Sequence, residues 1–368
     1  MRLSDCRWLI TMALGASGCV VPLDHEFDDD AASPSTDDGG ADDAPAVAAG
    51  CEVLGGTAGV TTLAGDARSL GLADGGAIWI VDQATTPDGG LALPAAFVVG
   101  SERADAGCGG GNATFAGSAV APSPLAPNGL IAPLDLVATS AGPALYYQLF
   151  ASDPTQPLGL RALGVGLAPR DPTTGMFVPT SELLWSADRP TYGGSALSVG
   201  GTVFVWGCTS SGAFTSDCFV AKASDAEVAS TAGYSYWTGD DWSSSADDAA
   251  PVTQGGGVVS VRPDATRAGR WLMTYVPPLG NTLVIRSAIA PEGPWSAPVT
   301  LASCALDGAG PGAFCGGGEQ HAELATTGSA TLALTYDAQT FVTDAGSPLD
   351  ARAFWPQLVT LPIPPSLP

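Results

Sequence analysis

The most constraining feature of this chain is a strand–turn–strand pattern that recurs about five times. Each copy has a polar strand start, a short turn, and an apolar strand with an aromatic residue near its end. These aromatic residues are Trp79, Tyr147, Trp206, Tyr275 and Tyr336, which stand 68, 59, 69 and 61 residues apart. A repeat of this size in an all-strand sequence is typical of radially arranged sheets, so the sequence predicts a propeller with five blades.

Length and local pattern agree with that architecture. The segment 51–368 is long enough for five blades of about 62 residues each. Strand-like alternation bounded by Gly, Pro, Asp and Asn dominates it, and long amphipathic helix patterns are absent. The predicted fold class is therefore all-β, with residues 51–368 forming one five-bladed β-propeller domain. A β-sandwich is the alternative, although its strands normally have shorter and less regular spacing.

Residues 1–19 resemble the signal peptide of a bacterial lipoprotein. Arg2 and Arg7 form a weakly basic start. The apolar segment that follows, residues 8–14, is too short to span a bilayer. Small residues then lead to Cys19, as in the lipobox, where the cysteine is acylated. The resemblance implies lipidation at Cys19 and stable anchoring by its acyl chains. An ordinary cleaved signal peptide with an incidental cysteine is the alternative.

The following segment, residues 20–50, predicts a disordered acidic tether. It has almost no large apolar side chain after Phe27, and Asp24 to Asp43 holds nine of the 37 acidic residues. With the signal before it, we expect an exported protein, lipid-anchored at the bacterial outer membrane or cell surface. Contact with the membrane is then expected only through the N-terminal lipid.

The charge balance excludes some partners. The net charge is −24, and Lys222 is the only lysine. Nucleic acids and anionic lipid headgroups need cationic patches, which this sequence lacks, so neither is an expected partner. We expect a monomer that binds a glycan or another small polar ligand.

Six cysteines follow Cys19, an even number that predicts disulfides in an exported protein. Two pairs are local, and the third follows by elimination. The predicted disulfides are Cys51–Cys108, Cys208–Cys218 and Cys304–Cys315. No zinc site is expected, because no CxxC pair exists and His321 is the only histidine of the predicted domain. No cofactor is predicted; an axial Ca²⁺ is compatible with a propeller, but nothing in the sequence demands it.

Four elements carry a resemblance to known families. The segment Gly293-Pro294-Trp295-Ser296, followed by Pro298, resembles a blade element of five-bladed propellers that include glycoside hydrolase family 43. The run from Tyr234 to Trp242 is similar to an element of a bacterial family known as domain of unknown function 4185. The segments 65–82 and 321–336 are similar to the first and last blades of that family. The resemblance covers roughly residues 60–340 and implies a propeller, without a settled activity.

Ligands commonly bind where the innermost strands of a propeller converge on its axis. The candidate axial residues are Asp66, Arg68, Ser195, Arg262, Glu319, His321 and Glu323. Asp66 and Glu323 are the candidate catalytic carboxylates, because two carboxyl groups facing each other across the axis at about 5–10 Å suit glycoside hydrolysis. The other five are candidate ligand-binding residues.

Structural alternatives exist for several of these residues. Asp66 is also suited to capping a turn, and Glu323 to pairing with Arg262 or Arg286. His321 is also suited to a purely structural role. Another set of residues suits either stacking on sugar rings or filling the space between blades: Tyr234, Tyr236, Trp237 and Trp242.

Three functions therefore remain open. The first is a surface-anchored lipoprotein that binds a carbohydrate or similar polar ligand at the axial mouth. The second is a glycoside hydrolase-like enzyme, and the third is a structural or interaction lipoprotein without a small-molecule site. Two close axial carboxylates in an open pocket would favour hydrolysis, whereas a plugged channel would favour the third reading.

Overall fold

The computed structural model describes residues 46–48, 50–100, 108, 113–156, 159–212, 215–310, 312–325, 329–340 and 354–368. The predicted signal peptide, the lipidation site Cys19 and nearly all of the predicted tether lie outside the described residues. No described helix is both long and apolar enough to cross a membrane.

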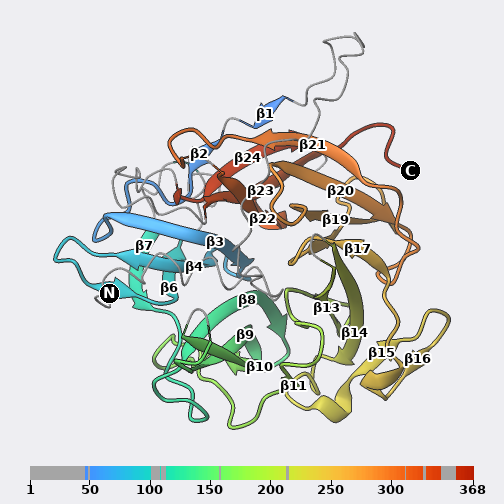
Figure 1. The fold of residues 1–368 in the computed structure, drawn as a ribbon, viewed down its shortest axis with the longest axis horizontal. Helices are drawn as coiled ribbons and strands as arrows, with labels where there is room; N and C mark the ends of the chain where they lie inside the picture. The colour runs from blue at the N-terminus through green and yellow to red at the C-terminus, as the bar shows by residue number, and fades with distance from the viewer. Residues whose placement is uncertain are drawn as a thin grey trace, which may run out of the picture.

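Five sheets stand around one axis as the blades of a propeller, and their strands pair antiparallel except for the parallel pair β1–β21 at the edge of blade 4 (Figure 1). In each blade the first strand lies nearest the axis, and its successors follow outward. Blade 1 consists of β3 (Thr62–Gly71), β4 (Ala77–Thr85), β6 (Ala95–Val99) and β7 (Ala113–Ser118), with β5 (Leu91–Ala92) beside β4. Blade 2 consists of β8 (Leu130–Thr139), β9 (Gly142–Ser152), β10 (Leu160–Pro169) and β11 (Trp185–Ser186).

The third blade is the widest. It consists of β12 (Ser195–Val199), β13 (Thr202–Gly212), β14 (Thr215–Ser224), β15 (Ser235–Trp237) and β16 (Trp242–Ser243), with β17 (Thr253–Gly255) beside β14. Three 3₁₀ turns lie outside the sheets: η1 (Thr231–Gly233), η2 (Ala246–Asp248) and η3 (Ala322–Leu324).

The last two blades take their outermost strands from the N-terminal side of the ring, and the outermost strand of blade 4, at residues 47–48, lies in the segment that the sequence predicted to be a disordered tether. Blade 4 consists of β18 (Ser260–Pro263), β19 (Trp271–Tyr275), β20 (Thr282–Ala288), β21 (Val299–Cys304) and β1 (Val47–Ala48). Blade 5 consists of β22 (Phe314–Gln320), β23 (Thr331–Gln339), β24 (Gln357–Pro362) and β2 (Cys51–Glu52). Because β2 pairs with β24, chain segments from both ends of the domain share one sheet and close the ring.

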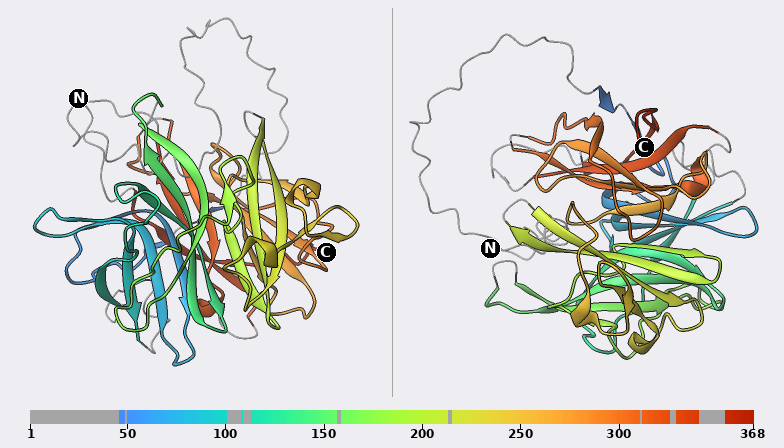
Figure 2. Two further views of the ribbon diagram at one scale, coloured as in Figure 1. Left: turned by 90° about the horizontal axis from the view of Figure 1, so that it is seen from below. Right: turned by 90° about the vertical axis from the view of Figure 1, so that its right-hand side faces the viewer.

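All five predicted aromatic positions lie on the second strand of their blades. Trp79 is on β4, Tyr147 on β9, Trp206 on β13, Tyr275 on β19 and Tyr336 on β23. The repeat therefore marks one hairpin per blade, and the prediction of a five-bladed propeller is confirmed. Figure 2 shows these strands running from one face of the ring to the other. The β-sandwich alternative is wrong.

The core is divided into apolar clusters between neighbouring blades, because each strand sends alternate side chains to opposite faces of its sheet. Strand β4 illustrates this alternation. Ile78 and Ile80 pack with Leu145 of blade 2, whereas Trp79 and Val81 pack against blade 5. A sheet with two buried faces needs a continuous apolar run, which is the pattern that the sequence shows in these second strands.

The six cysteines pair as the sequence predicts. Cys208–Cys218 joins directly opposed residues of β13 and β14, and Cys304–Cys315 joins blade 4 to blade 5. Cys51–Cys108 joins β2 of blade 5 to a residue that stands between β6 and β7 of blade 1 in the sequence. This third disulfide therefore reinforces the closure of the ring covalently.

Replacement of both Cys51 and Cys108 by Ser should lower the free energy of unfolding by about 4 kcal/mol, because the disulfide closes a loop with a separation of 57 residues. Urea unfolding under oxidising conditions measures this loss. The single variant Cys51→Ser should lose as much as the double variant, since either change removes the same covalent link. A double variant that loses clearly more stability than Cys51→Ser, or one that loses none, would contradict a ring-closing role of the disulfide.

Candidate functional site

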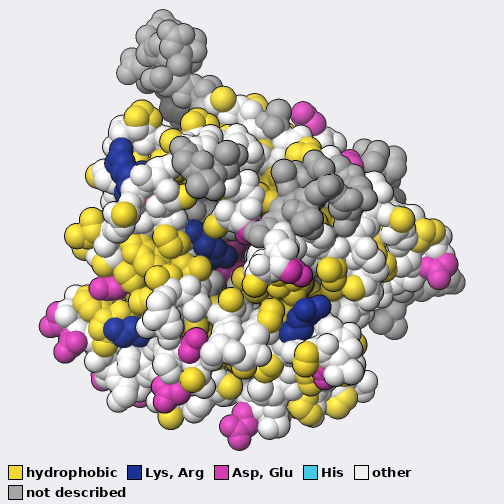
Figure 3. Space-filling view, turned by 180° about the vertical axis from the view of Figure 1, so that it is seen from behind, with side chains coloured by type: hydrophobic (Ala, Val, Ile, Leu, Met, Phe, Trp, Pro, Cys, Tyr) yellow, Lys and Arg dark blue, Asp and Glu magenta, His cyan; other side chains and the backbone are white. Residues whose placement is uncertain are grey.

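The first strands of all five blades bring buried polar side chains to the axis. Six of the seven residues predicted from the sequence lie on these strands or directly after one. Asp66 and Arg68 are on β3, Ser195 on β12, Arg262 on β18 and Glu319 on β22, while His321 follows β22. The seventh, Glu323, lies in η3. On the face of the ring opposite that of Figure 1, basic and acidic side chains meet in a central hollow (Figure 3).

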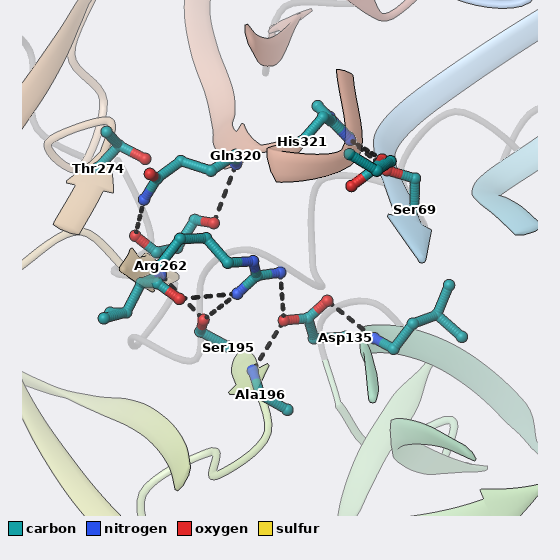
Figure 4. A network of polar contacts seen from close by, with 12 residues as sticks. Ser69, Asp135, Ser195, Ala196, Arg262, Thr274, Gln320 and His321 are labelled. Atoms are coloured by element: carbon teal, nitrogen blue, oxygen red, sulfur yellow. Dashed lines mark hydrogen bonds and ion pairs between the residues drawn. The ribbon is translucent and has the colours of Figure 1, made fainter. Parts of the chain in front are cut away.

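Arg262 connects three blades through one buried guanidinium group (Figure 4). Its Nη2 lies 3.0 Å from Asp135 Oδ2 of blade 2, and its Nη1 donates to Ser195 Oγ of blade 3 at 3.1 Å. Asp135 also accepts the backbone N–H groups of Leu136 and Ala196, at 2.8 and 2.7 Å. Since Asp135 is only 1% exposed, these bonds compensate for the removal of its charge from water.

Arg68 organises a second group of charges within blade 1. Its Nη1 lies 2.9 Å from Asp82 Oδ1, and its Nη2 lies 3.1 Å from Asp66 Oδ2. The backbone N–H of Asp66 donates to Asp82 Oδ2 at 3.1 Å. Gly65 permits this approach, because it has a φ of 87° and a side chain there would collide with the Asp82 carboxylate. Asp66 Oδ1 is buried, and the Asp66 carboxylate interacts with the Asp337 carboxyl group through a side-chain hydrogen bond.

Three acidic groups of this region hold their protons more tightly than usual. Burial raises the pKa of Asp82 to about 6, against the opposing charge of Arg68. Burial and the negative charge of Asp135 raise the pKa of Glu319 to about 8. Burial, followed by the charges of Asp66 and Asp82, raises the pKa of Asp337 well above its ordinary value. At neutral pH, Glu319 is therefore mostly a neutral carboxylic acid.

Glu319 is a further buried acidic residue of the axial region. It is 3% exposed, and its side chain accepts no hydrogen bond from the described residues, although the charges of Arg68 and Arg262 act on it. A buried polar group without a protein partner normally binds water or a ligand.

His321 lies in a buried chain of hydrogen bonds that joins blade 5 to blade 1. Its Nδ1 lies 2.5 Å from Ser69 Oγ, its Nε2 lies 2.7 Å from Thr335 Oγ1, and its ring stacks on Trp79. The Ser69 hydroxyl also hydrogen-bonds Glu323 Oε1. His321 is 1% exposed and bonded at both nitrogens, which agrees with the structural alternative for this residue.

The two candidate catalytic carboxylates have separate surroundings. Asp66 belongs to the Arg68 group of blade 1, whereas Glu323 bonds to Ser69 and belongs to neighbouring blade 5. No hydrogen bond or ion pair joins the two within the described residues, and Glu323 pairs with neither Arg262 nor Arg286 there. Although burial acts in the opposite direction, the interactions with His321 and Ser69 lower the pKa of Glu323, so this group is a poor proton donor at neutral pH.

The sequence predictions omitted several residues of the axial region. Asp135 contributes the carboxylate of blade 2, and Asp82 and Asp337 come from second strands. Each follows at least one apolar or aromatic residue in a strand with buried neighbours, as in Leu134-Asp135-Leu136. A lone carboxylate in an otherwise apolar strand was the available signal, because such a group needs a buried partner.

The aromatic residues of blade 3 have two different environments. Tyr234 and Tyr236 are buried between blades 2 and 3, where the Tyr234 hydroxyl lies 2.7 Å from Tyr146 Oη and Tyr236 accepts from Trp185 Nε1 at 2.9 Å. These two residues therefore fill the space between blades. Trp237 and Trp242, by contrast, are only partly buried, and their rings pack edge to face.

No three His, Cys, Asp or Glu side chains within the described ranges are arranged to hold a metal ion. The carboxylates of Asp66 and Asp82 in blade 1 are both bound to Arg68. The axial Ca²⁺ that the sequence allowed without demanding it has no matching ligand set among these residues.

Comparisons with known proteins agree with this ring of blades. Residues 177–330 match the family model of a domain of unknown function, DUF4185. The DUF4185 match spans blades 3 and 4 with adjoining parts of blades 2 and 5. No curated protein sequence matches the chain.

Solved structures show the same fold over most of the chain. One is a hydrolase candidate from Bacteroides ovatus, with a TM-score of 0.59, 16% identity, and coverage of 83% of this chain and 86% of that one. Another is a GH43_1 enzyme from Xanthomonas citri complexed with xylose, with a TM-score of 0.50, 14% identity, and coverage of 86% and 90%. At these identities the likeness to GH43 enzymes concerns the fold alone.

Glu319→Gln should remove a pH dependence of stability. The folded pKa of Glu319 is raised from 4.5 to about 8, so its contribution to stability is fully present below about pH 4.5 and is lost as pH rises through about 8. As pH rises between those values, the free energy of unfolding of the wild type should fall by more than about 1 kcal/mol relative to that of Glu319→Gln. Urea unfolding at a series of pH values measures the difference. Parallel profiles would contradict it, and exposed Glu182→Gln is the matched control.

Arg262→Met should destabilise the protein by about 3–5 kcal/mol, because it leaves Asp135 charged and buried without its main partner. Adding Asp135→Asn to that variant should recover part of the loss, since the uncompensated charge is then removed. A double-mutant cycle from urea unfolding measures both effects. A double variant less stable than Arg262→Met would show that the uncompensated charge of Asp135 is not the cause of the lost stability.

Proposed function

We propose that this protein binds a carbohydrate through the polar groups at the propeller axis. The observation that carries the proposal is the Glu319 carboxyl group, which is buried, is mostly neutral at pH 7, and has no hydrogen-bond partner among the described residues. A neutral carboxylic acid both donates and accepts a hydrogen bond, as a sugar hydroxyl group does. It attracts a metal cation far less than a carboxylate does, which favours a neutral hydroxylated ligand.

The neighbouring groups suit the same class of ligand. Arg68 Nε is a buried donor without a hydrogen-bond partner among the described residues. A small number of convergent polar groups in a largely preformed region is typical of small-molecule sites. The GH43_1 structure from Xanthomonas citri, which shares this fold, was solved with xylose. That neighbour supports a sugar as the ligand to test first.

Glycoside hydrolysis is a second candidate function, and the raised pKa of Glu319 is the observation that favours it. A general acid must hold a proton at the working pH, which Glu319 does with a pKa of about 8. Glu323, whose pKa is lowered, suits that role poorly. For the enzymatic reading we therefore propose Glu319 as the acid, with Asp66 kept as the second carboxyl group.

We further propose that this binding domain lies at the bacterial cell surface and is held there by a lipid on Cys19. The three disulfides of the domain are consistent with an oxidising compartment outside the cytoplasm. An acidic segment between lipid and domain would hold the axial region away from the membrane.

A glycan array probed with the full-length protein should show binding, and two substitutions of Glu319 should separate the two functions. Glu319→Met keeps the volume but removes the polar atoms, so affinity should fall about tenfold or more. Glu319→Gln keeps a donor and an acceptor, so binding should persist within about threefold. If the protein hydrolyses the bound glycan, Glu319→Gln should abolish product formation, because an amide does not supply the proton to the leaving group.

Exposed Glu182→Gln serves as the control and should bind as the wild type does. Failure of the wild type to bind any glycan would overturn the proposal and favour a structural or interaction role. Unchanged binding by Glu319→Met would overturn the axial location. Release of reducing sugar by the wild type, but not by Glu319→Gln, would establish the enzymatic function.

A further inference from the structure

Blade 3 has a cluster of partly buried aromatic side chains beside a lysine, on strands outside the innermost one. Phe204 on β13 lies directly opposite Leu197 on β12 and Lys222 on β14, close to the β12–β13 turn. The Trp242 ring lies beside Phe204, with ring centroids 6.4 Å apart. These residues and Trp237 are all partly buried, so each presents some of its surface to solvent. We call Phe204, Lys222, Trp237 and Trp242 the aromatic platform.

The aromatic platform rests on a rigid foundation. Phe204 packs with buried Trp206 and Trp271, at centroid distances of 6.1 and 5.9 Å. Trp237 and Trp242 pack edge to face at 5.4 Å. Figure 3 shows hydrophobic side chains gathered over blades 3 and 4, between the central hollow and the rim. Partly buried aromatic rings that are fixed by a buried layer lose little conformational freedom when a ligand binds.

Lys222 gives this surface its charge. It is the only lysine of a chain with a net charge of −24, yet it forms no ion pair with an acidic side chain of the described residues. Its ammonium group lies 3.9 Å from the centre of the Trp242 ring instead. A cation–π contact contributes about 0.5–1 kcal/mol at an exposed site and leaves the donors of the ammonium group free for an anion.

We propose that the aromatic platform binds a sugar unit that carries one carboxylate, such as a hexuronic acid, within an otherwise neutral glycan. The aromatic rings match the apolar C–H face of a sugar, and the Lys222 ammonium group matches its carboxylate. The overall negative charge disfavours a dense polyanion, so one carboxylate per bound segment fits better than a uniformly acidic polymer. This inference rests on the proposed carbohydrate binding for its ligand class and adds a site that recognises charge.

The test compares two probes that differ by one acidic sugar, xylotriose and the same trisaccharide bearing a single glucuronosyl branch. Isothermal titration calorimetry with the full-length protein should show about tenfold tighter binding of the acidic probe, which corresponds to about 1.4 kcal/mol. Lys222→Gln should remove that advantage, while Lys222→Arg should keep most of it. Trp242→Ala should weaken acidic-probe binding about three- to tenfold, through loss of stacking.

Near-ultraviolet circular dichroism of each variant checks that the fold is retained. Equal affinity of the wild type for both probes, or no binding of either, would overturn the proposal. Persistence of the advantage in Lys222→Gln would do the same. Glu319→Met separates this inference from the axial proposal, because it should weaken the neutral probe and leave the advantage of the acidic probe intact. Binding of the acidic probe alone, abolished by Lys222→Gln, would support the platform and contradict the axial site.

Discussion

The structure depends on the burial of charge at the point where five inner strands meet. The radial arrangement brings Arg68, Arg262, Asp135 and Glu319 into one region that has little contact with water. A buried charge is tolerated only with a partner, and Asp135 finds its partner Arg262 two blades away. The mutual position of blades 2, 3 and 4 is therefore fixed by directional bonds as well as by the apolar clusters between the sheets.

The fold was predictable because the second strand of each blade has a recognisable apolar sequence that recurs along the chain. These strands are buried on both faces, so each must be apolar, and the aromatic residues Trp79 to Tyr336 mark them at similar intervals. The closing strands were not predictable. Val47–Ala48 and Cys51–Glu52 are two-residue strands, too short for any periodic pattern, and they owe their place to the sheet edges of blades 4 and 5.

The axial residues were partly predictable, and their partners were not. A polar residue on an inner strand is expected near the axis, and Asp66, Ser195 and Arg262 all lie on inner strands. The prediction that Asp66 and Glu323 face each other needed the order and rotation of the blades, which no local pattern contains. In the ring they occupy neighbouring blades, and the proton-holding group is Glu319, because its environment combines burial with nearby negative charge.

The energetics of the axis argue that it serves more than the fold. Replacement of buried ion pairs by apolar side chains of equal volume is often neutral or stabilising, so ring closure alone does not require this set of charges. The raised pKa values of Asp82, Asp337 and Glu319 mean that ionising these groups destabilises the folded state. Glu319 and Arg68 Nε are buried without a hydrogen-bond partner among the described residues, and they are the groups whose hydrogen bonds the proposed hydroxylated ligand would complete.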